Sequence, residues 1–438
     1  MSYQTPRGMN RRHFMEHMAA SAALTVPAAS MFTHALRAGA ADMQKRHKAA
    51  ILLYMSSGPA TIDIWDLKPG APTGGEFKPI DTTASGVQIT EHMPLMAQQM
   101  KHMAIVRSMS TREADHARGR YYMHTGYVPN PTVDYPSYGA VISHELSSQS
   151  HGLEIPPFIS IGGASEGPGF LGMSYAPFVV DSNGDVRNLD LSMDVGRLQQ
   201  RMTMLSELER NFASQRRGEA ASDHGKVLDS TVNLMTSKQM AAFKVTAEPA
   251  KILERYGVNA PAGGGGGRGM ARNTTFGKSC LMARRLVEQG VPFVEVDMGG
   301  WDDHQNVFTN LKQRLPALDQ GMSALVEDLN DRGMLQDTAI IWMGDFGRTP
   351  RINGRAGRDH WARSWSCVVG GGGLKGGQAV GKTNSDGTQV ESEPYTSQDL
   401  MASVLKGLGI SLETVFTSKN NRPMKIANSG RVIKELFA

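Results

Sequence analysis

The stretch Leu286-Val287-Glu288-Gln289-Gly290-Val291-Pro292-Phe293-Val294-Glu295-Val296 ends a helical pattern and starts a strand. At its N-terminal side, residues 275–289 carry apolar side chains at a spacing that predicts a helix, and Gly290 is a typical residue just after a helix. At its C-terminal end, residues 293–296 form a short apolar run that predicts a buried strand. A helix that leads directly into a buried strand is typical of an α/β fold.

The same alternation extends outward along the chain. Residues 316–332 place apolar side chains at three- and four-residue spacing, which predicts a helix with Pro316 in its first turn. Apolar runs of strand length occur at residues 49–55, 103–106, 158–161, 293–296, 339–343 and 366–369. Such continuous runs suit strands that are buried on both faces. We therefore predict one α/β domain over residues 42–438, with a mostly parallel central sheet and helices on both faces.

The middle of the chain departs from this alternation. Residues 189–260 are rich in Met, Leu, Gln, Glu and Arg, which predicts several helices inserted into the domain and packed on the sheet. The glycine run at residues 263–267 then predicts a flexible loop.

The N-terminal segment has the features of an export signal. Arg11-Arg12-His13-Phe14 precedes an Ala- and Ser-rich run, and small residues at 38–41 offer a cleavage site. The apolar run is shorter than the roughly 20 residues of a membrane-spanning helix, so no permanent membrane span is expected. Residues 1–41 are therefore predicted to be a twin-arginine signal, with the twin-arginine translocase as partner during export and a periplasmic or otherwise exported location. An ordinary amphipathic helix is the alternative.

Charge and cysteine content exclude several classes of protein. Without residues 1–41, Lys+Arg falls from 46 to 42 and Asp+Glu from 42 to 41, because four arginines and one glutamate are removed. A nearly neutral chain gives no support for nucleic-acid binding. The two cysteines, Cys280 and Cys367, exclude a disulfide scaffold and a thiolate-only metal cluster. They form either one bridge or two separate thiols.

One motif suggests a nucleotide site and is rejected on its context. Residues 376–383 match the phosphate-binding pattern G-x-x-x-x-G-K-[ST]. That pattern works between a strand and a helix, whereas Asn384-Ser385-Asp386-Gly387 predicts a turn directly after it.

Acidic and histidine side chains concentrate in the loops that follow the predicted strands. These loops cover residues 56–66, 115–126, 299–304 and 344–361. Ligands of open α/β sheets bind at the carboxyl ends of the strands. Carboxylates and imidazoles on converging loops are the ligands of divalent cations such as Zn²⁺ or Mn²⁺, which stabilise the charge of a phosphoryl or sulfuryl transition state. Taken singly, Asp63 or Asp66 could be a turn residue, Asp302 a helix cap and His360 a core histidine.

At these residues the chain resembles the domain of unknown function 1501 family, exported proteins grouped with the alkaline phosphatase and sulfatase superfamily. The resemblance spans nearly the whole mature chain and implies an alkaline phosphatase-like fold. The residues that carry it are Gly58-Pro59 through Asp63, Asp66, Lys68, Pro69, Gly299-Gly300-Trp301-Asp302 with His304, Asp345-Phe346-Gly347-Arg348-Thr349-Pro350 and Gly357-Arg358-Asp359-His360-Trp361.

The chain departs from the sulfatase pattern at three places. Asp345 matches a metal-binding aspartate, but Phe346 stands where sulfatases have a histidine. His116 stands at the position of the nucleophile, with Arg120 at that of the conserved arginine. Ser56-Ser57 replaces a pair of aspartates, for which Asp63 or Asp66 could compensate. His116 could act as a nucleophile, a general base or a metal ligand.

Two functions follow from these observations. The first is a metal-dependent hydrolase of phosphate or sulfate esters, acting on anionic small molecules or polysaccharide esters outside the cytoplasm. Its expected metal ligands are Asp63, Asp302, His304, Asp345 and His360, with His116 as nucleophile or base and Arg120 or Arg348 binding the anionic oxygens. The second is a non-catalytic binding or assembly protein that retains the fold.

Overall fold

A computed structural model describes residues 47–148, 152–184, 194–214, 233–235, 237–258 and 268–437. The predicted signal segment, residues 1–41, and the glycine run at 263–267 lie outside these ranges. The described residues from Lys48 onward form one compact unit.

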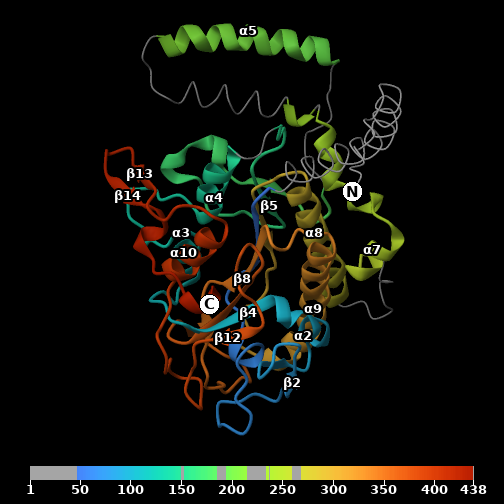
Figure 1. The fold of residues 1–438 in the computed structure, drawn as a ribbon, viewed down its shortest axis with the longest axis vertical. Coiled ribbons are helices and arrows are strands. Elements are labelled where there is room, and N and C mark those ends of the chain that lie inside the picture. The colour runs from blue at the N-terminus through green and yellow to red at the C-terminus, as the bar shows by residue number, and fades with distance from the viewer. Residues whose placement is uncertain are drawn as a thin grey trace, which may run out of the picture. The chain divides into compact units, whose positions relative to one another are not determined.

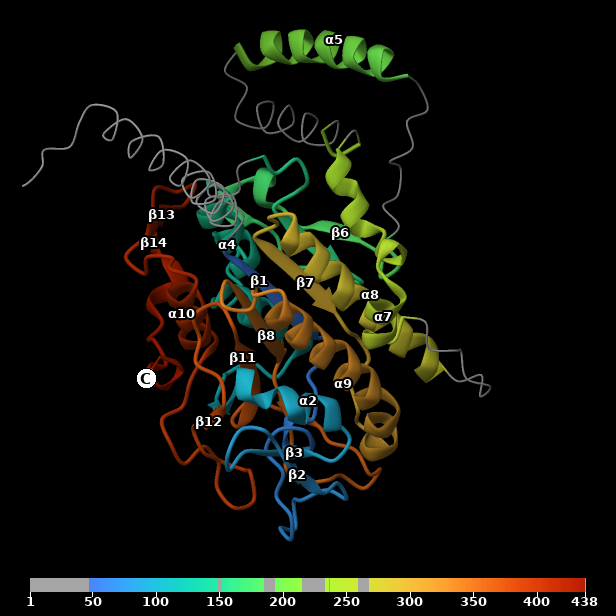
Figure 2. The same cartoon turned by 45° about the vertical axis from the view of Figure 1, so that its right-hand side comes forward.

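The centre of this unit is an eight-stranded sheet (Figures 1 and 2). Its strand order is β12 (Gln378–Val380), β4 (Met103–Met109), β11 (Trp365–Gly370), β8 (Thr338–Gly344), β1 (Ala49–Met55), β7 (Phe293–Asp297), β5 (Phe158–Ile161) and β6 (Phe178–Val180). Strand β11 is antiparallel to both of its neighbours, and every other pair is parallel. The predicted mostly parallel sheet is confirmed, and β6 and β12 are additions that the apolar runs did not indicate.

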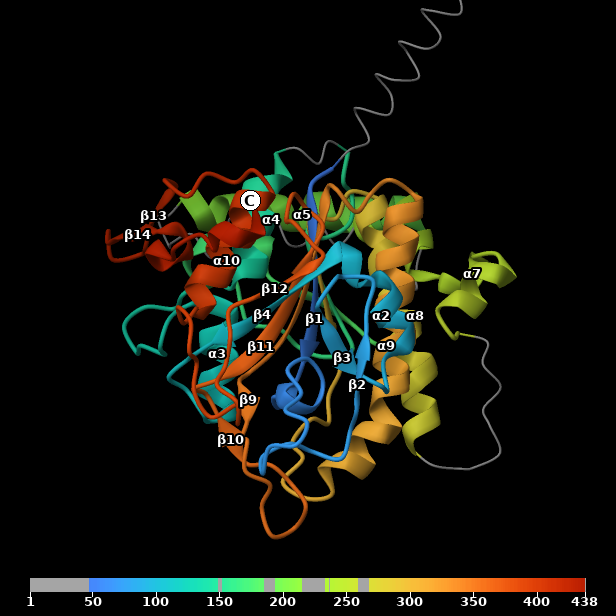
Figure 3. The ribbon, with the colours of Figure 1, turned by 60° about the horizontal axis from the view of Figure 1, so that its bottom comes forward.

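Helices cover both faces of the sheet, as predicted (Figure 3). Alternate residues of β1 point to opposite sides. Ile51 and Leu53 pack with the layer of α2 (Pro94–Gln99), α8 (Arg268–Glu288) and α9 (Val307–Asp331). Leu52 and Tyr54 pack with the layer of α3 (His116–Thr125), α4 (Tyr138–Ser147) and α10 (Ser397–Gly407). The sheet therefore lies between two apolar cores.

The predicted start of α9 is wrong. The helix begins at Val307, and Pro316 lies inside it rather than in its first turn. The apolar stripe extends further back than the pattern suggested, because Val307, Leu311 and Leu315 are all buried. Burial of these side chains outweighs the cost of a proline within a helix, about 3 kcal/mol.

Shorter elements complete the described chain. Three ribbons pair β2 (Pro79–Asp81) with β3 (Gln88–Thr90), β9 (Gly347–Arg348) with β10 (His360–Trp361), and β13 (Val415–Thr417) with β14 (Pro423–Lys425). The 3-10 helices are η1 (Thr61–Asp63), η2 (Met100–His102), η3 (Gly169–Leu171), η4 (Met173–Tyr175), η7 (Ile426–Ser429) and η8 (Lys434–Leu436). The described part of residues 189–260 is helical, with α5 (Val195–Ser214), η5 (Lys238–Phe243), η6 (Val245–Ala247) and α7 (Ala250–Arg255).

Three further structural features concern the cysteines, the phosphate-loop pattern and the length of the apolar helices. Cys280 and Cys367 are free, buried thiols in opposite cores. Strand β12 lies inside the phosphate-loop pattern, and the next helix begins only at Ser397, so the pattern lacks its strand-to-helix setting. Within the described residues, no helix combines the length and apolarity that a membrane span requires.

A buried carboxylate joins two helices. Asp319 of α9 accepts hydrogen bonds from the backbone N–H groups of Leu95 (3.0 Å) and Met96 (2.6 Å) at the start of α2, which has no side-chain cap of its own. Burial raises the pKa of Asp319 to about 6, although the two N–H groups act in the opposite direction.

Asp319 should make the stability of the protein depend on pH. Because its pKa is higher in the folded than in the unfolded chain, its stabilising contribution is complete below about pH 4 and is lost as the pH rises through about 6. The free energy of unfolding of the wild type, relative to Asp319→Asn, should therefore fall by up to about 3 kcal/mol between pH 4 and pH 7. Urea unfolding of both proteins across this range measures the difference. A constant difference would contradict the expectation.

Candidate functional site

The candidate site lies where the carboxyl ends of β7 and β8 meet the start of α3. The loop after β7 carries Asp302 and His304. The antiparallel pairing of β9 and β10 places His360 opposite Arg348. His116 is the first residue of α3, after an Asp115 cap that accepts the N–H of Arg118 at 3.2 Å. Four segments that are distant in the sequence therefore converge.

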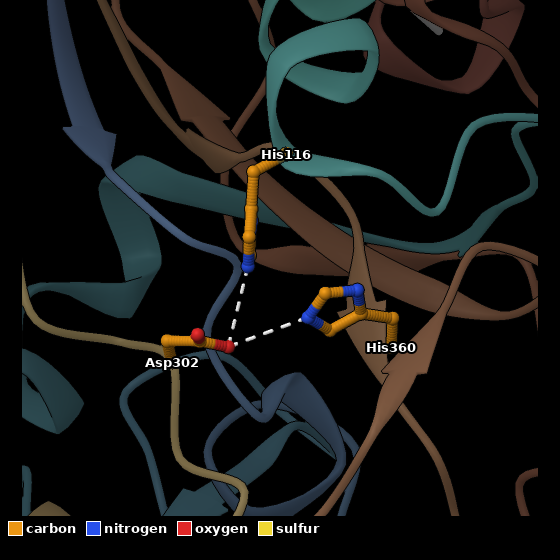
Figure 4. Close-up of side chains that lie close together, drawn as sticks. All are labelled: His116, Asp302 and His360. Carbon is orange, nitrogen blue, oxygen red and sulfur yellow. Dashed lines mark hydrogen bonds and ion pairs between the residues drawn. The ribbon is translucent and has the colours of Figure 1, made fainter.

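One oxygen of Asp302 is surrounded by three imidazoles. Its Oδ1 lies 3.2 Å from Nε2 of His116, 3.1 Å from Nε2 of His304 and 3.3 Å from Nε2 of His360. The Nε2 atoms of His304 and His360 are 3.1 Å apart. Figure 4 shows His116 and His360 pointing at Asp302 from two sides. We call His116, Asp302, His304 and His360 the imidazole cluster.

The Nδ1 atom of each of the three imidazole rings lies close to a hydrogen-bond acceptor outside the cluster. Nδ1 of His116 is 2.8 Å from Asp345 Oδ2, and Nδ1 of His304 is 2.7 Å from Asp359 Oδ1. Nδ1 of His360 is 2.8 Å from the carbonyl oxygen of Ala114, which can only accept a hydrogen bond. In the neutral state each ring therefore keeps its proton on Nδ1 and directs a lone pair from Nε2 into the cluster.

The pKa values of three residues of the cluster are shifted by their surroundings. The hydrogen bond to Asp345 raises the pKa of His116 above its usual value. Burial lowers the pKa of His360. Burial acts to raise the pKa of Asp302, but the hydrogen bond and charge of Arg348 outweigh it and hold that pKa well below its usual value. Asp302 is therefore a carboxylate at neutral pH.

The donor atoms of the cluster suit a divalent metal ion. Those of His116, Asp302 and His360 all lie within 4.8 Å of one another. Nε2 of His116 is buried and has no hydrogen-bond partner, although it lies near Asp302. The three imidazole side chains are 25–34% exposed, so the cluster is accessible from solvent. Imidazole nitrogens with one carboxylate oxygen are a common zinc-binding set.

Asp345 lies directly behind His116. It is 3% exposed, and its two oxygens contact Nδ1 of His116 and the hydroxyl of Tyr54. Burial raises the pKa of Tyr54 well above its usual value, so the hydroxyl remains a donor. The ring of Phe346 stacks on His116 with centroids 5.1 Å apart. Asp345 therefore lies beside the cluster and contacts it through His116.

The structure does not bring Asp63 to the imidazole cluster. Asp63 and Arg358 are 2% and 0% exposed, and Arg358 donates to both carboxylate oxygens, at 2.6 and 2.8 Å. Asp66, the alternative candidate, pairs with Lys68 at 3.0 Å. Both aspartates are held by cations of the chain.

The two predicted anion-binding arginines have partners within the chain. Arg348 is buried, and it donates to the backbone of Ser57, Gly58 and Arg358 and to Asp302 Oδ1 at 2.6 Å. Arg120 lies within 3.3–3.8 Å of three carboxylates, those of Glu166, Asp297 and Glu295. Arg348 therefore joins the cluster through Asp302, and Arg120 belongs to a neighbouring group of charges.

A cavity of about 450 Å³ adjoins the loop that carries Asp302. Its walls include Asp297, Gly299, Gly300, Thr275, Phe276 and Ser279. Among the described residues that line it there is no lysine, arginine or histidine. This lining favours a neutral, hydroxyl-bearing group over a second anionic group.

Three groups around the cluster were not among the predicted site residues: Asp359 and the Ala114 carbonyl contact it directly, and Tyr54 contacts it through Asp345. Tyr54 stands near the end of an apolar strand, where a buried hydroxyl needs a partner, and this was the signal available for it. Asp359 directly precedes His360 and was a visible acceptor. The Ala114 carbonyl has no sequence signal, because any residue supplies that group.

Comparison with known proteins gives one family match. A family profile described as "Protein of unknown function (DUF1501)" matches residues 47–437. No curated protein matches the sequence.

Several solved structures have a similar fold. The PsFucS1 sulfatase from Pseudoalteromonas sp. is 14% identical, with TM-score 0.39, covering 84% of this chain and 69% of that one. The phosphonate monoester hydrolase from Silicibacter pomeroyi is 10% identical, with TM-score 0.37, covering 90% and 77%. Alkaline phosphatase from the Antarctic bacterium TAB5 is 12% identical, with TM-score 0.34, covering 83% and 99%.

Proposed function

The chain belongs to the DUF1501 family, and from that premise we propose that it is a zinc-dependent hydrolase of phosphate or sulfate esters. In this proposal His116, Asp302, His304 and His360 hold the metal. The family description assigns no activity, and the side chains of the site support this one.

The observation that carries the proposal is the convergence of lone pairs in the imidazole cluster. Three rings donate from Nδ1 to outer acceptors, so their Nε2 lone pairs face one another and a carboxylate oxygen at 3.1–3.3 Å. Such an arrangement is repulsive unless a cation or added protons lie between the groups. Protonation of His116, whose pKa Asp345 raises, would relieve part of this repulsion but leaves the Nε2 atoms of His304 and His360 facing each other at 3.1 Å. A single divalent cation would satisfy all of these groups at once.

Zinc fits this set better than manganese. Imidazole nitrogens suit zinc, whereas manganese prefers oxygen ligands. When bound, zinc would supply Lewis-acid stabilisation of the charge that develops on the ester oxygens. The chain itself contributes the orientation of the ligands, because outer acceptors fix all three rings and Arg348 fixes Asp302.

The cavity beside the loop of Asp302 leads us to propose an ester with one anionic and one neutral part. The anionic group would lie at the partly exposed imidazole cluster. The alcohol part would lie in the adjoining cavity, whose lining carries hydroxyl groups and no cation among the described residues. In the hydrolysis, a water oxygen bonds to phosphorus or sulfur, the bond to the alcohol oxygen breaks, and that oxygen takes up a proton.

Hydrolysis of 4-nitrophenyl phosphate and sulfate by the zinc-loaded and zinc-free protein tests the function. We expect turnover only with zinc, and a rate reduced to that of the uncatalysed reaction in His360→Ala. His144→Ala is the matched control, because His144 lies on α4 and contacts Glu145 and Tyr175 outside the cluster. Protein that binds zinc at the cluster but hydrolyses neither ester, nor a phosphonate monoester, would overturn the hydrolase and favour a binding role.

Export belongs to the same proposal. Arg11-Arg12 before an Ala-rich run supports translocation of the folded chain by the twin-arginine route to the periplasm. Cell fractionation tests it, since the chain should be recovered outside the cytoplasm and should remain inside when both arginines are replaced by lysine.

A further inference from the structure

In the sequence, Asp345 stands at the position of a metal-binding aspartate of sulfatases. Its contacts in the structure indicate another role. The donor atoms that lie within 4.8 Å of one another come from His116, Asp302 and His360, and Asp345 is not among them. Each oxygen of Asp345 has a partner, Nδ1 of His116 for one and the hydroxyl of Tyr54 for the other. The carboxylate is 3% exposed. These contacts place Asp345 behind His116 and outside the set of converging donor atoms.

We infer that Tyr54 and Asp345 are positioning residues, which form a Tyr54–Asp345–His116 relay that holds the His116 proton on Nδ1 and directs its Nε2 lone pair into the cluster. This inference rests on the proposed function for its purpose, because the relay serves to present a metal ligand. Carboxylates that accept from the outer nitrogen of a metal-binding histidine fix its tautomer and raise its basicity.

Tyr54 is itself held on two sides, which fixes the direction of its hydroxyl. The guanidinium of Arg120 lies 4.9 Å from the centroid of its ring, and the ring of His124 meets it edge-on at 4.4 Å. Tyr54 is fully buried at the end of β1, one residue before the strand ends. A hydroxyl fixed in this way holds the Asp345 carboxylate in one orientation.

Phe346 completes the support of His116. Its ring is buried and lies nearly parallel to the imidazole, with an interplanar angle of 25°. Gly119 of α3 allows this contact, because a Cβ there would lie 2.8 Å from Phe346 Cδ1. The ring plane of His116 is thus fixed by Phe346 and its tautomer by Asp345.

The test compares Tyr54→Phe and Asp345→Ala with the wild type. Tyr256→Phe is the matched control, because Tyr256 is also fully buried and donates to a carboxylate, Asp328, at 3.1 Å, outside the site. Zinc affinity is measured by competition with a chelator. In the zinc-free proteins, ¹⁵N spectra of the histidines, with the His116 signal identified by its loss in His116→Gln, report which nitrogen carries the proton.

We expect zinc affinity to fall by about 10- to 100-fold in Asp345→Ala and by about tenfold in Tyr54→Phe, with no change in Tyr256→Phe. The His116 proton should move from Nδ1 toward Nε2 in Asp345→Ala. The relay is overturned if Tyr54→Phe matches Tyr256→Phe in affinity and the His116 tautomer is the same in all variants. If the wild type binds no zinc, the proposed function fails, and the ¹⁵N spectra alone then support or overturn the relay.

Discussion

Replacing His360 by alanine is expected to lower zinc affinity by more than about 100-fold. Removing a partner behind a ligand costs about 10- to 100-fold in metal affinity, so removing the ligand itself should cost more. His360 is well placed for this test, because its Nδ1 contacts only a backbone carbonyl and its loss leaves no buried charge without a partner. Chelator competition on the purified protein measures the effect.

The folded state of the His360→Ala protein must be checked at the same time. Its far-ultraviolet circular dichroism and unfolding midpoint without metal should match those of the wild type, and His144→Ala should keep wild-type zinc affinity. A His360→Ala protein that is folded and binds zinc as tightly as the wild type would remove His360 from the metal site.

Replacing Asp63 by alanine is expected to lower the free energy of unfolding by about 3–5 kcal/mol. The substitution leaves the guanidinium of Arg358, which is 0% exposed, without its carboxylate partner. Urea unfolding in excess chelator measures this loss, because a bound metal would otherwise add its own stabilisation. Glu76→Ala is the control, since Glu76 pairs with Lys312 at the surface and should contribute at most about 1 kcal/mol.

A double variant separates the ion pair from other effects of the substitution. Asp63→Ala combined with Arg358→Met should lose less stability than the sum of the two single variants, because the two side chains interact directly. A loss of less than about 1 kcal/mol in Asp63→Ala, together with loss of zinc from the folded protein, would return Asp63 to the ligand set.

The fold was predictable from the sequence because strands that are buried on both faces consist of continuous apolar runs. The apolar runs at residues 49–55 and 293–296 coincide with β1 and β7 to within one residue. The start of α9 was not predictable from Pro316, because the stripe of Val307, Leu311 and Leu315 overrides the local preference. Strands β6 and β12 are three residues each and too short to show a pattern.

Only the residues of the site that follow the ends of strands were predictable from the sequence. The rule that ligands gather at the carboxyl ends of strands pointed to Asp302, His304 and His360, which the structure brings together. This rule could not show that Asp63 lies outside the site, because the partner of that carboxylate, Arg358, is 295 residues away in the chain. It also could not separate a ligand from the group behind a ligand, which is the difference that we propose between His116 and Asp345.

The departure at Phe346 illustrates this limit. The sequence showed a phenylalanine where sulfatases have a histidine, which indicates a lost ligand. In the structure the Phe346 ring lies 5.1 Å from the His116 ring and 4.8 Å from the His360 ring. The phenylalanine therefore supports two imidazoles that other segments supply.

X-ray absorption at the zinc edge of the purified wild-type protein determines whether the imidazole cluster holds zinc. We expect near-stoichiometric zinc with a first shell of imidazole nitrogens at about 2.0–2.1 Å and one or more oxygens at about 2.0–2.2 Å. A protein that stays folded and takes up no metal, or a shell of oxygens alone, would show that the cluster is not a zinc site.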